Sequence, residues 1–350
     1  MFGPSALGHK KVLNETLFPA KGALVLETIS SFGLMFYYFL WSLRLDLYTL
    51  LKTEKVAVAL AISVFTSSLV VPAGLSLLLK KYVAQENNVA KALPFVGLSQ
   101  AYTVFVSVTV LLTDLKMLNT DIGRLTISVS ILISIAGFIL SVIMSIVLQS
   151  QNGNILTVIL IALSVISFVL FITFTMRPVV LWMVKHPGRG SINEICIVCI
   201  FVFVMLSGFL GDIIGQHFPM GPIIFGLSLP EGPPIGTSLM TILDTMCTAF
   251  LNPICLAVHG LKADIFQIDL DSTCTICLVL AAGLFTKIGA VMVSGYYFSI
   301  SMKECWVIGL ILNGRGISEL VLYNLWLQSE VCMYVCGSLL NSISKSFNAC

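Results

Sequence analysis

The sequence predicts an all-α, polytopic transmembrane helical bundle, and three observations lead to that fold class. Of the 350 residues, 57% are hydrophobic and only 10% are charged. A soluble globular domain carries about 25% charged residues, so a chain of this composition would not stay in solution. The mean hydropathy is +1.01, and the apolar residues form runs that reach the length of about 20 residues needed to cross a bilayer.

The charge balance and the cysteines argue against other classes of protein. The formal net charge is only +2, so no basic surface for nucleic acid is expected. Cys274 and Cys277 form a C-x-x-C pair inside an apolar run, where cysteines usually serve as small packing residues. Nucleophile elbows, phosphate-binding loops and metal-ligand spacings are absent from the sequence. We therefore predict no enzyme, no metal site and no cofactor.

Nine stretches are long and apolar enough to be membrane spans. They are Ala23–Leu43, Val56–Leu79, Ala92–Leu112, Leu125–Leu148, Ile155–Thr175, Ile195–Ile214, Ser238–Val258, Thr273–Ser299 and Cys305–Leu327. Two shorter apolar pieces, Phe218–Leu229 and Val331–Leu340, bring the expected total to about nine to eleven membrane segments. The connectors are too short for a soluble domain. Residues 1–350 are therefore expected to form a single transmembrane domain in the lipid bilayer, without a soluble C-terminal domain.

Two of these spans contain helix interruptions of the kind found at transporter sites. In Ala92–Leu112 the interrupting and polar residues are Pro94, Gly97, Ser99, Gln100 and Thr103, and in Cys305–Leu327 they are Gly309, Asn313, Gly314 and Gly316. Many secondary transporters place their site where two discontinuous helices meet near the middle of the membrane, and freed carbonyl groups coordinate a cation there. We therefore expect two discontinuous helices with the ion site between them.

Three charged residues, Lys287, Arg315 and Glu319, lie inside predicted spans. A charge at the centre of a span costs roughly 2.5–3.5 kcal/mol even on a lenient insertion scale, so such residues usually face the bundle interior and pair or bind a transported ion. Lys287 lies about halfway along its span. Burial disfavours the charged form of a lysine, so Lys287 could release its proton when a cation arrives. The alternatives are a structural ion pair and a side chain that extends to the interface.

The other candidate site residues have competing structural interpretations. Arg315 and Glu319 are four residues apart on one helical face, so they can handle an ion or simply pair with each other. Asn313 and Thr103 can offer neutral oxygens to a cation or hydrogen-bond between helices. Asp212, five residues before a histidine, can form a proton relay or a pH sensor, or lie at the membrane boundary, where charges cost little.

Six short stretches, in order along the whole chain, match the motifs of one known family. They are residues 3–8 (GPSALG), 26–36 (LETISSFGLMF), 115–124 (LKMLNTDIGR), 211–217 (GDIIGQH), 229–233 (LPEGP) with Pro253 and Gly260-Leu261-Lys262, and Lys287 with residues 312–320 (LNGRGISEL). In these the chain resembles the plant cation/proton exchanger (CHX) family of the monovalent cation:proton antiporter-2 group.

The resemblance implies an NhaA-like antiporter fold that exchanges K⁺ or Na⁺ for H⁺ by alternating access, in pH and K⁺ homeostasis. It implies residence in a plant plasma membrane or endomembrane, and a homodimer is possible. It also implies an incomplete exchanger domain, because family members have further spans at both ends and a long cytosolic domain.

Two departures from the family pattern keep a second function open. Family members have an Asn-Asp pair where this chain has Ile133 and Ser134, and that acid is the usual carrier of ion and proton. The span Leu125–Leu148 contains no carboxylate. Arg44 stands where the family has a glutamate. The alternative prediction is therefore a transport-inactive or modulatory membrane scaffold that has lost the ion-binding acid.

Overall fold

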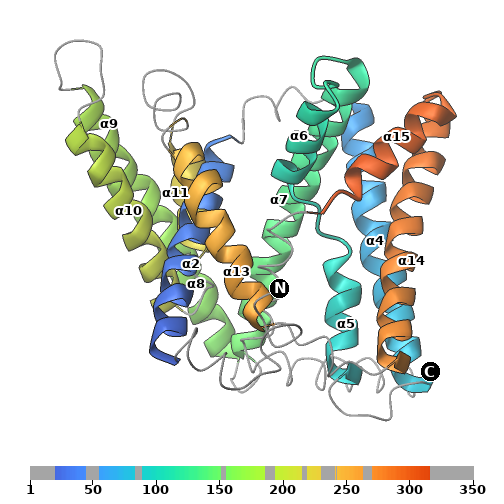
Figure 1. Ribbon diagram of the computed structural model, residues 1–350, viewed down its shortest axis with the longest axis horizontal. Coiled ribbons are helices and arrows are strands. Elements are labelled where there is room, and N and C mark those ends of the chain that lie inside the picture. Colours follow the sequence, from blue (N-terminus) through green and yellow to red (C-terminus); the bar gives the residue numbers. More distant parts are fainter. Residues whose placement is uncertain are drawn as a thin grey trace. The chain divides into compact units, whose positions relative to one another are not determined.

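The computed structural model describes residues 20–44, 55–82, 89–150, 155–185, 194–214, 219–229, 241, 243–262 and 270–315. Every regular element in these ranges is a helix (Figure 1), which confirms the predicted all-α class. Six helical stretches in the described ranges are long and apolar enough to cross a membrane. They are Leu24–Leu43, Lys55–Lys80, Asp121–Ile143, Ile159–Trp182, Cys196–Ile213 and Cys274–Tyr297.

The chain divides into two compact units, each made of two sequence segments. The first unit comprises Met1–Leu47 and Ser145–Gln267, and the second comprises Tyr48–Met144 and Ile268–Cys350. Lys287 and the predicted interruption at Thr103 therefore belong to the same unit although they are 184 residues apart in sequence.

The described helices of the first unit pack around a core of aromatic and aliphatic side chains. They are α2 (Ala20–Leu43), α8 (Ile155–Phe171), η2 (Ile172–Met176), α9 (Arg177–Lys185), α10 (Glu194–Ile213), α11 (Met220–Ser228), η3 (Cys247–Leu251) and α13 (Asn252–Lys262). Phe39 of α2 and Phe225 of α11 are fully buried and stack with ring centroids 5.5 Å apart. The predicted half-span Phe218–Leu229 is thus a short helix, α11, most of whose residues are buried.

Two π-helical turns in this unit share a local cause. Each of η2 and η3 ends two residues before a proline, Pro178 or Pro253. Proline lacks a backbone N–H and its ring crowds the preceding turn, so a wider turn just before it accommodates the ring. The predicted span Ile155–Thr175 therefore continues through η2 into α9 rather than ending at Thr175.

The second unit contains α4 (Lys55–Tyr82), α5 (Val89–Ser99), α6 (Phe105–Asp114), most of α7 (Asp121–Ser150), α14 (Leu270–Tyr297) and α15 (Met302–Leu312). Figure 1 shows α4, α5 and α14 side by side, and α15 folds back along α14. A capping box fixes the start of α15, because the Ser301 hydroxyl accepts from the Glu304 N–H and the Glu304 carboxylate accepts from the Ser301 N–H.

The core of the second unit joins α4, α6, α7, α14 and α15. Its fully buried members include Leu60, Val108, Val129, Val291 and Leu312. Of the predicted span Cys305–Leu327, residues up to Arg315 are described, and the short piece Val331–Leu340 lies outside the described residues.

Candidate functional site

The predicted span Ala92–Leu112 is divided into two helices, α5 and α6. Turn hydrogen bonds close α5, from Gln100 N to Gly97 O at 3.2 Å and from Tyr102 N to Ser99 O at 3.2 Å. The chain is then extended up to Val104, whose φ and ψ are −92° and 122°, before α6 begins at Phe105. An extended stretch between helices leaves backbone N–H and C=O groups that need partners from elsewhere.

Ser134 of α7 supplies partners for this extended stretch. The buried Ser134 hydroxyl accepts a hydrogen bond from Phe105 N at 2.9 Å. The same Oγ lies 2.8 Å from Thr103 O and 2.7 Å from Ser130 O, to either of which it can donate its one proton. A neutral hydroxyl from α7 therefore caps the first turn of α6, at the position where the family resemblance implies an acid.

Lys287 of α14 places its ammonium group on the extended stretch. Nζ donates to Thr103 Oγ1 at 2.7 Å and to the Tyr102 carbonyl oxygen at 3.1 Å. Lys287 and Thr103 are each only 2% exposed. This burial excludes the predicted alternative in which Lys287 extends to the membrane interface.

Thr103 also connects the extended stretch to the end of α15. Its Oγ1 lies 3.4 Å from the carbonyl oxygen of Leu312, the last residue of α15. Oγ1 accepts from Lys287 and can donate to this carbonyl, because a hydroxyl has one proton and two lone pairs. The extended stretch between α5 and α6 and the end of α15 therefore meet at one threonine side chain.

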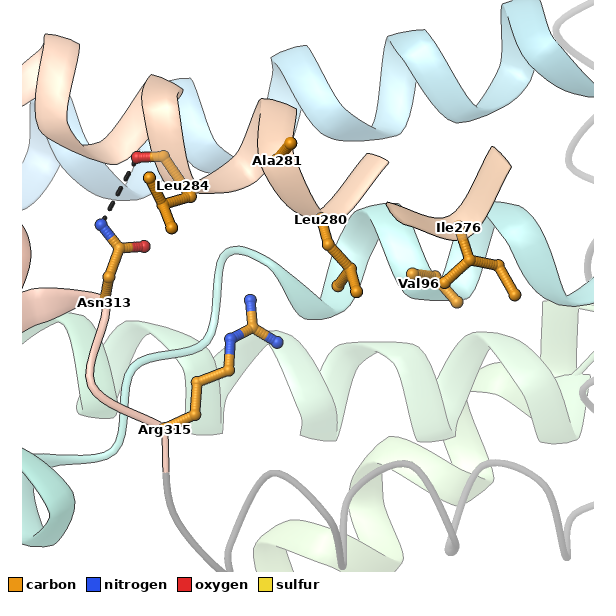
Figure 2. Close-up of a pocket in the computed structure, with 7 residues that line it drawn as sticks. All are labelled: Val96, Ile276, Leu280, Ala281, Leu284, Asn313 and Arg315. Atoms are coloured by element: carbon orange, nitrogen blue, oxygen red, sulfur yellow. Dashed lines mark hydrogen bonds between the residues drawn. The ribbon is translucent and has the colours of Figure 1, made fainter. Parts of the chain in front are cut away.

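Asn313 and Arg315 follow the end of α15 and lie close to the same group of residues. Asn313 Nδ2 donates to Gly309 O at 2.9 Å and to Leu284 O at 3.4 Å, the second of which is drawn in Figure 2. Arg315 Nη2 donates to Oε1 of the fully buried Gln100, which lies just after α5. Two of the predicted site residues are thus tied to α14 and to the α5–α6 interruption.

Gln100 fits against α14 because residue 283 is a glycine. A Cβ atom added to Gly283 would come within 2.7 Å of the Gln100 side chain. The sequence places Gln100 in the interrupted span without assigning it a role. The hydrogen bond that its side chain accepts from Arg315 could not be predicted from the sequence. The role of the Tyr102 carbonyl as an acceptor for Lys287 was likewise not predicted, because every residue carries a carbonyl group and the sequence does not distinguish this one.

The remaining predicted site residues do not join this group of contacts. Asp212 lies exposed near the end of α10 in the other unit, and the histidine five residues later, His217, is outside the described residues. Glu319 is also outside the described residues. A proton relay through Asp212 and a pairing of Arg315 with Glu319 both stay predictions.

Arg44, which departs from the family pattern, has an acidic partner. Arg44 Nη2 lies 2.7 Å from Oδ1 of Asp244, and the two side chains are 28% and 47% exposed. The pairing of two residues 200 positions apart depends on tertiary packing and leaves no local pattern.

The candidate site offers mainly neutral oxygens to a ligand. In the part of the chain that the structure describes, no three His, Cys, Asp or Glu side chains gather in a way that could hold a metal ion. Carbonyl and hydroxyl oxygens, such as those of Tyr102 and Thr103, suit hard monovalent cations, which need no anionic cage.

Comparisons with known proteins agree with the resemblance seen in the sequence. The family model described as "Sodium/hydrogen exchanger, transmembrane" matches residues 1–342. The chain is 30% identical to cation/H(+) antiporter 18 of Arabidopsis thaliana over 327 residues, which is 93% of the chain and 40% of that protein. It is 28% identical to antiporter 15 over 335 residues, 95% of the chain and 40% of that protein. It is 30% identical to antiporter 17 over 328 residues, 93% of the chain and 40% of that protein. The chain thus spans about 40% of the length of these relatives.

Proposed function

Because this chain belongs to the sodium/hydrogen exchanger transmembrane family, we propose that it exchanges a monovalent cation, K⁺ or Na⁺, for a proton by alternating access. The chain is an integral, multi-pass membrane protein. The observation that supports the proposal most directly is the buried ammonium group of Lys287 on the oxygens of Tyr102 and Thr103. An ionisable group inside a membrane segment is a functional candidate by default, because burying it is costly.

The oxygens that hold Lys287 could equally hold a transported cation. The Thr103 hydroxyl and the Tyr102 carbonyl are neutral acceptors, and neither distinguishes an ammonium group from an alkali cation by charge. Two unit positive charges 4 Å apart repel by about 4 kcal/mol at an effective dielectric constant of about 20. A cation and a protonated Lys287 would therefore exclude each other from the site. Binding of the cation would release the proton of Lys287, and reprotonation would release the cation.

Helix ends of opposite sign lie around this site. The C-terminal end of a helix carries about half a negative elementary charge, and a cation near it gains about 0.3–1 kcal/mol at exposed sites. α15 ends beside Thr103, with its last carbonyl group 3.4 Å from Oγ1, whereas α6 begins at Phe105, two residues after Thr103. The carbonyl end of α15 can stabilise either the lysine ammonium or the cation that replaces it, while the N-terminal end of α6, whose Phe105 N–H is hydrogen-bonded to Ser134 Oγ, opposes positive charge.

Ser134 supports the alternative function, a transport-inactive or modulatory scaffold. Its hydroxyl carries no charge at physiological pH, so it cannot take the proton-carrying role of the acid that the family resemblance implies there. The hydroxyl instead stabilises the backbone at the start of α6. Under the alternative, the chain keeps the bundle and its buried lysine but binds no cation.

Purified chain in proteoliposomes separates the two functions. A K⁺ or Na⁺ gradient is imposed and the internal pH is followed with a trapped dye. The antiporter function predicts cation-driven proton flux above that of empty liposomes, and the scaffold function predicts none. An inactive result would be assigned to the scaffold only if the reconstituted protein keeps a cooperative thermal transition.

A further inference from the structure

The Thr103 hydroxyl lies between the ammonium group of Lys287 and the end of α15. Its Oγ1 is 2.7 Å from Lys287 Nζ and 3.4 Å from the carbonyl oxygen of Leu312. A threonine hydroxyl has one hydrogen and two lone pairs, and the hydrogen rotates to suit its partners. The direction in which Thr103 donates therefore depends on whether Lys287 Nζ can accept a hydrogen bond.

The ammonium and amine forms of Lys287 differ in this respect. An ammonium group has three donors and no acceptor, so Thr103 accepts from it and donates to Leu312 O. When Nζ loses a proton to water, the neutral amine gains a lone pair. The distance of 2.7 Å to Nζ suits an O–H donor, whereas 3.4 Å to Leu312 O is long for one. The hydroxyl hydrogen then rotates to Nζ while it stays bonded to Oγ1, and Leu312 O loses this donor.

A monovalent cation in the site would turn the hydroxyl in the same direction as the ammonium group does. A cation held by Thr103 Oγ1 and Tyr102 O draws on the lone pairs of these oxygens and repels the hydroxyl hydrogen. The hydrogen therefore points away from the cation, toward Leu312 O. This cation-bound state rests on the proposed exchange function, whereas the two forms of Lys287 do not.

We propose that the Thr103 hydroxyl couples the occupancy of the site to the end of α15. It donates to Leu312 O when Lys287 is protonated or a cation is bound, and to Lys287 Nζ when the site holds neither. A ligand shifts a conformational equilibrium only through interactions that differ between the states. Exchange without leakage requires that the occupied forms change conformation and the empty form does not, and this hydrogen bond differs between them.

Two other hydrogen bonds hold the end of α15 in every state of Lys287. Asn313 Nδ2 donates to Leu284 O at 3.4 Å (Figure 2), and Arg315 Nη2 donates to Gln100 Oε1. Neither bond contains a group that changes its charge near neutral pH. Loss of the bond from Thr103 should therefore loosen the end of α15 without detaching it.

The other titratable or charged side chains described around this contact do not account for a response to pH. Arg315 stays a cation and Tyr102 a neutral phenol over about pH 6–9. The rest lie about two helical turns or more from the contact along their own helices, α4, α6, α7, α14 and α15. They are Lys55, Lys80, Asp114, Asp121, Arg124, Cys274, Cys277, Tyr296, Tyr297, Lys303, Glu304 and Cys305.

Hydrogen–deuterium exchange of the full chain in lipid nanodiscs, read by mass spectrometry, tests this coupling. Exchange of the backbone amides of residues 309–315 is followed over about pH 6–9, with choline chloride as the only added salt, and each rate is divided by the intrinsic chemical rate at that pH. We expect these amides in wild type to exchange about twofold to tenfold faster at the alkaline end, the factor that one hydrogen bond supports. Addition of Rb⁺ or Na⁺ there should restore slow exchange.

Three variants and an internal control make the test specific. Thr103→Val cannot donate, so exchange at residues 309–315 should be fast at every pH, whereas Thr103→Ser should keep the response of wild type. Lys287→Met has no ammonium group and only a weak acceptor, so Thr103 donates to Leu312 O and exchange should be slow at every pH. The amides at the start of α15, held by the capping box of Ser301, should not respond in any variant.

Exchange at residues 309–315 that does not change with pH in wild type, or that changes equally in Thr103→Val or in Lys287→Met, would overturn the proposal. If Thr103→Val loses its cooperative thermal transition, Lys287→Met alone decides. A pH response that both variants abolish, without any effect of Rb⁺ or Na⁺, would contradict the exchange function and support the coupling to the proton of Lys287.

Discussion

The Nζ atom of Lys287 lies 2.7 Å from Oγ1 of Thr103, and both side chains are almost completely buried. This contact joins the middle of α14 to the stretch where α5 and α6 are interrupted. It places the one strongly buried ammonium group of the described residues against backbone and hydroxyl oxygens. In the proposed exchange, these are the oxygens for which the proton of Lys287 and the cation compete.

Replacement of Thr103 by valine or serine tests the role of its hydroxyl group. Thr103→Val keeps the shape but removes the acceptor for Lys287, and a hydrogen bond to a charged group is worth about 1.5–3 kcal/mol. We expect cation-driven proton flux in proteoliposomes to fall at least about tenfold. Thr103→Ser keeps the hydroxyl and should retain most of the flux. Equal flux in the valine and serine variants would show that the hydroxyl takes no part.

Removal of the Lys287 ammonium group should abolish exchange if the chain transports. We expect Lys287→Ala to lose pH-dependent K⁺ uptake in yeast that lacks its own K⁺ transporters. Lys303→Ala is the matched control, because Lys303 is an exposed lysine at the start of α15. Uptake by Lys287→Ala equal to that of wild type, at equal expression, would refute the role assigned to this lysine.

Substitutions at Ser134 separate its structural role from the missing acid. Ser134→Ala leaves the Phe105 N–H without its side-chain partner, which should cost about 1–3 kcal/mol of stability and lower the thermal midpoint. Ser134→Asp can still accept from Phe105 N and adds the acid that the family resemblance implies, so transport should rise above wild type. A stably expressed Ser134→Asp without any gain would show that the missing acid is not what limits activity.

Two glycines of α14 provide a matched test of the packing around Gln100. A Cβ at Gly283 would meet the Gln100 side chain at 2.7 Å, whereas a Cβ at Gly289 would meet no atom within 4 Å. Overpacking costs about 1–3 kcal/mol, so Gly283→Ala should lower the thermal midpoint. Gly289→Ala should leave it unchanged or raise it, because alanine favours a helix by about 0.5–1 kcal/mol over glycine. The opposite order of midpoints would contradict the packing described for α5 and α14.

The sequence predicted the fold class, and it singled out Lys287 as a site candidate, because both steps depend on local composition. A bilayer requires long apolar helices, and the cost of a buried charge singles out Lys287 without knowledge of its neighbours. Polar and helix-breaking residues also surround Thr103, which lies between the end of α5 and the start of α6. These features can be found by reading one segment at a time.

The partners of these residues could not be predicted, because they come from tertiary packing. Gln100 meets Arg315 across 215 residues, and Arg44 meets Asp244 across 200 residues. Neither spacing corresponds to a helical or strand period. The function of Ser134 as a cap for α6 also depends on the approach of α7 to the interruption. Sequence alone identified Ser134 only through a departure from the family pattern.

The pH dependence of cation binding tests the proposed competition most directly. Equilibrium binding of radiolabelled Rb⁺ or Na⁺ to the purified chain is measured across a pH series for wild type and for Lys287→Met. Because Lys287 loses its proton as pH rises, wild-type affinity should increase with pH, and the affinity of Lys287→Met should be independent of pH over the same range. Binding by wild type that does not change with pH, or the same pH dependence in Lys287→Met, would contradict the competition between the cation and the proton of Lys287.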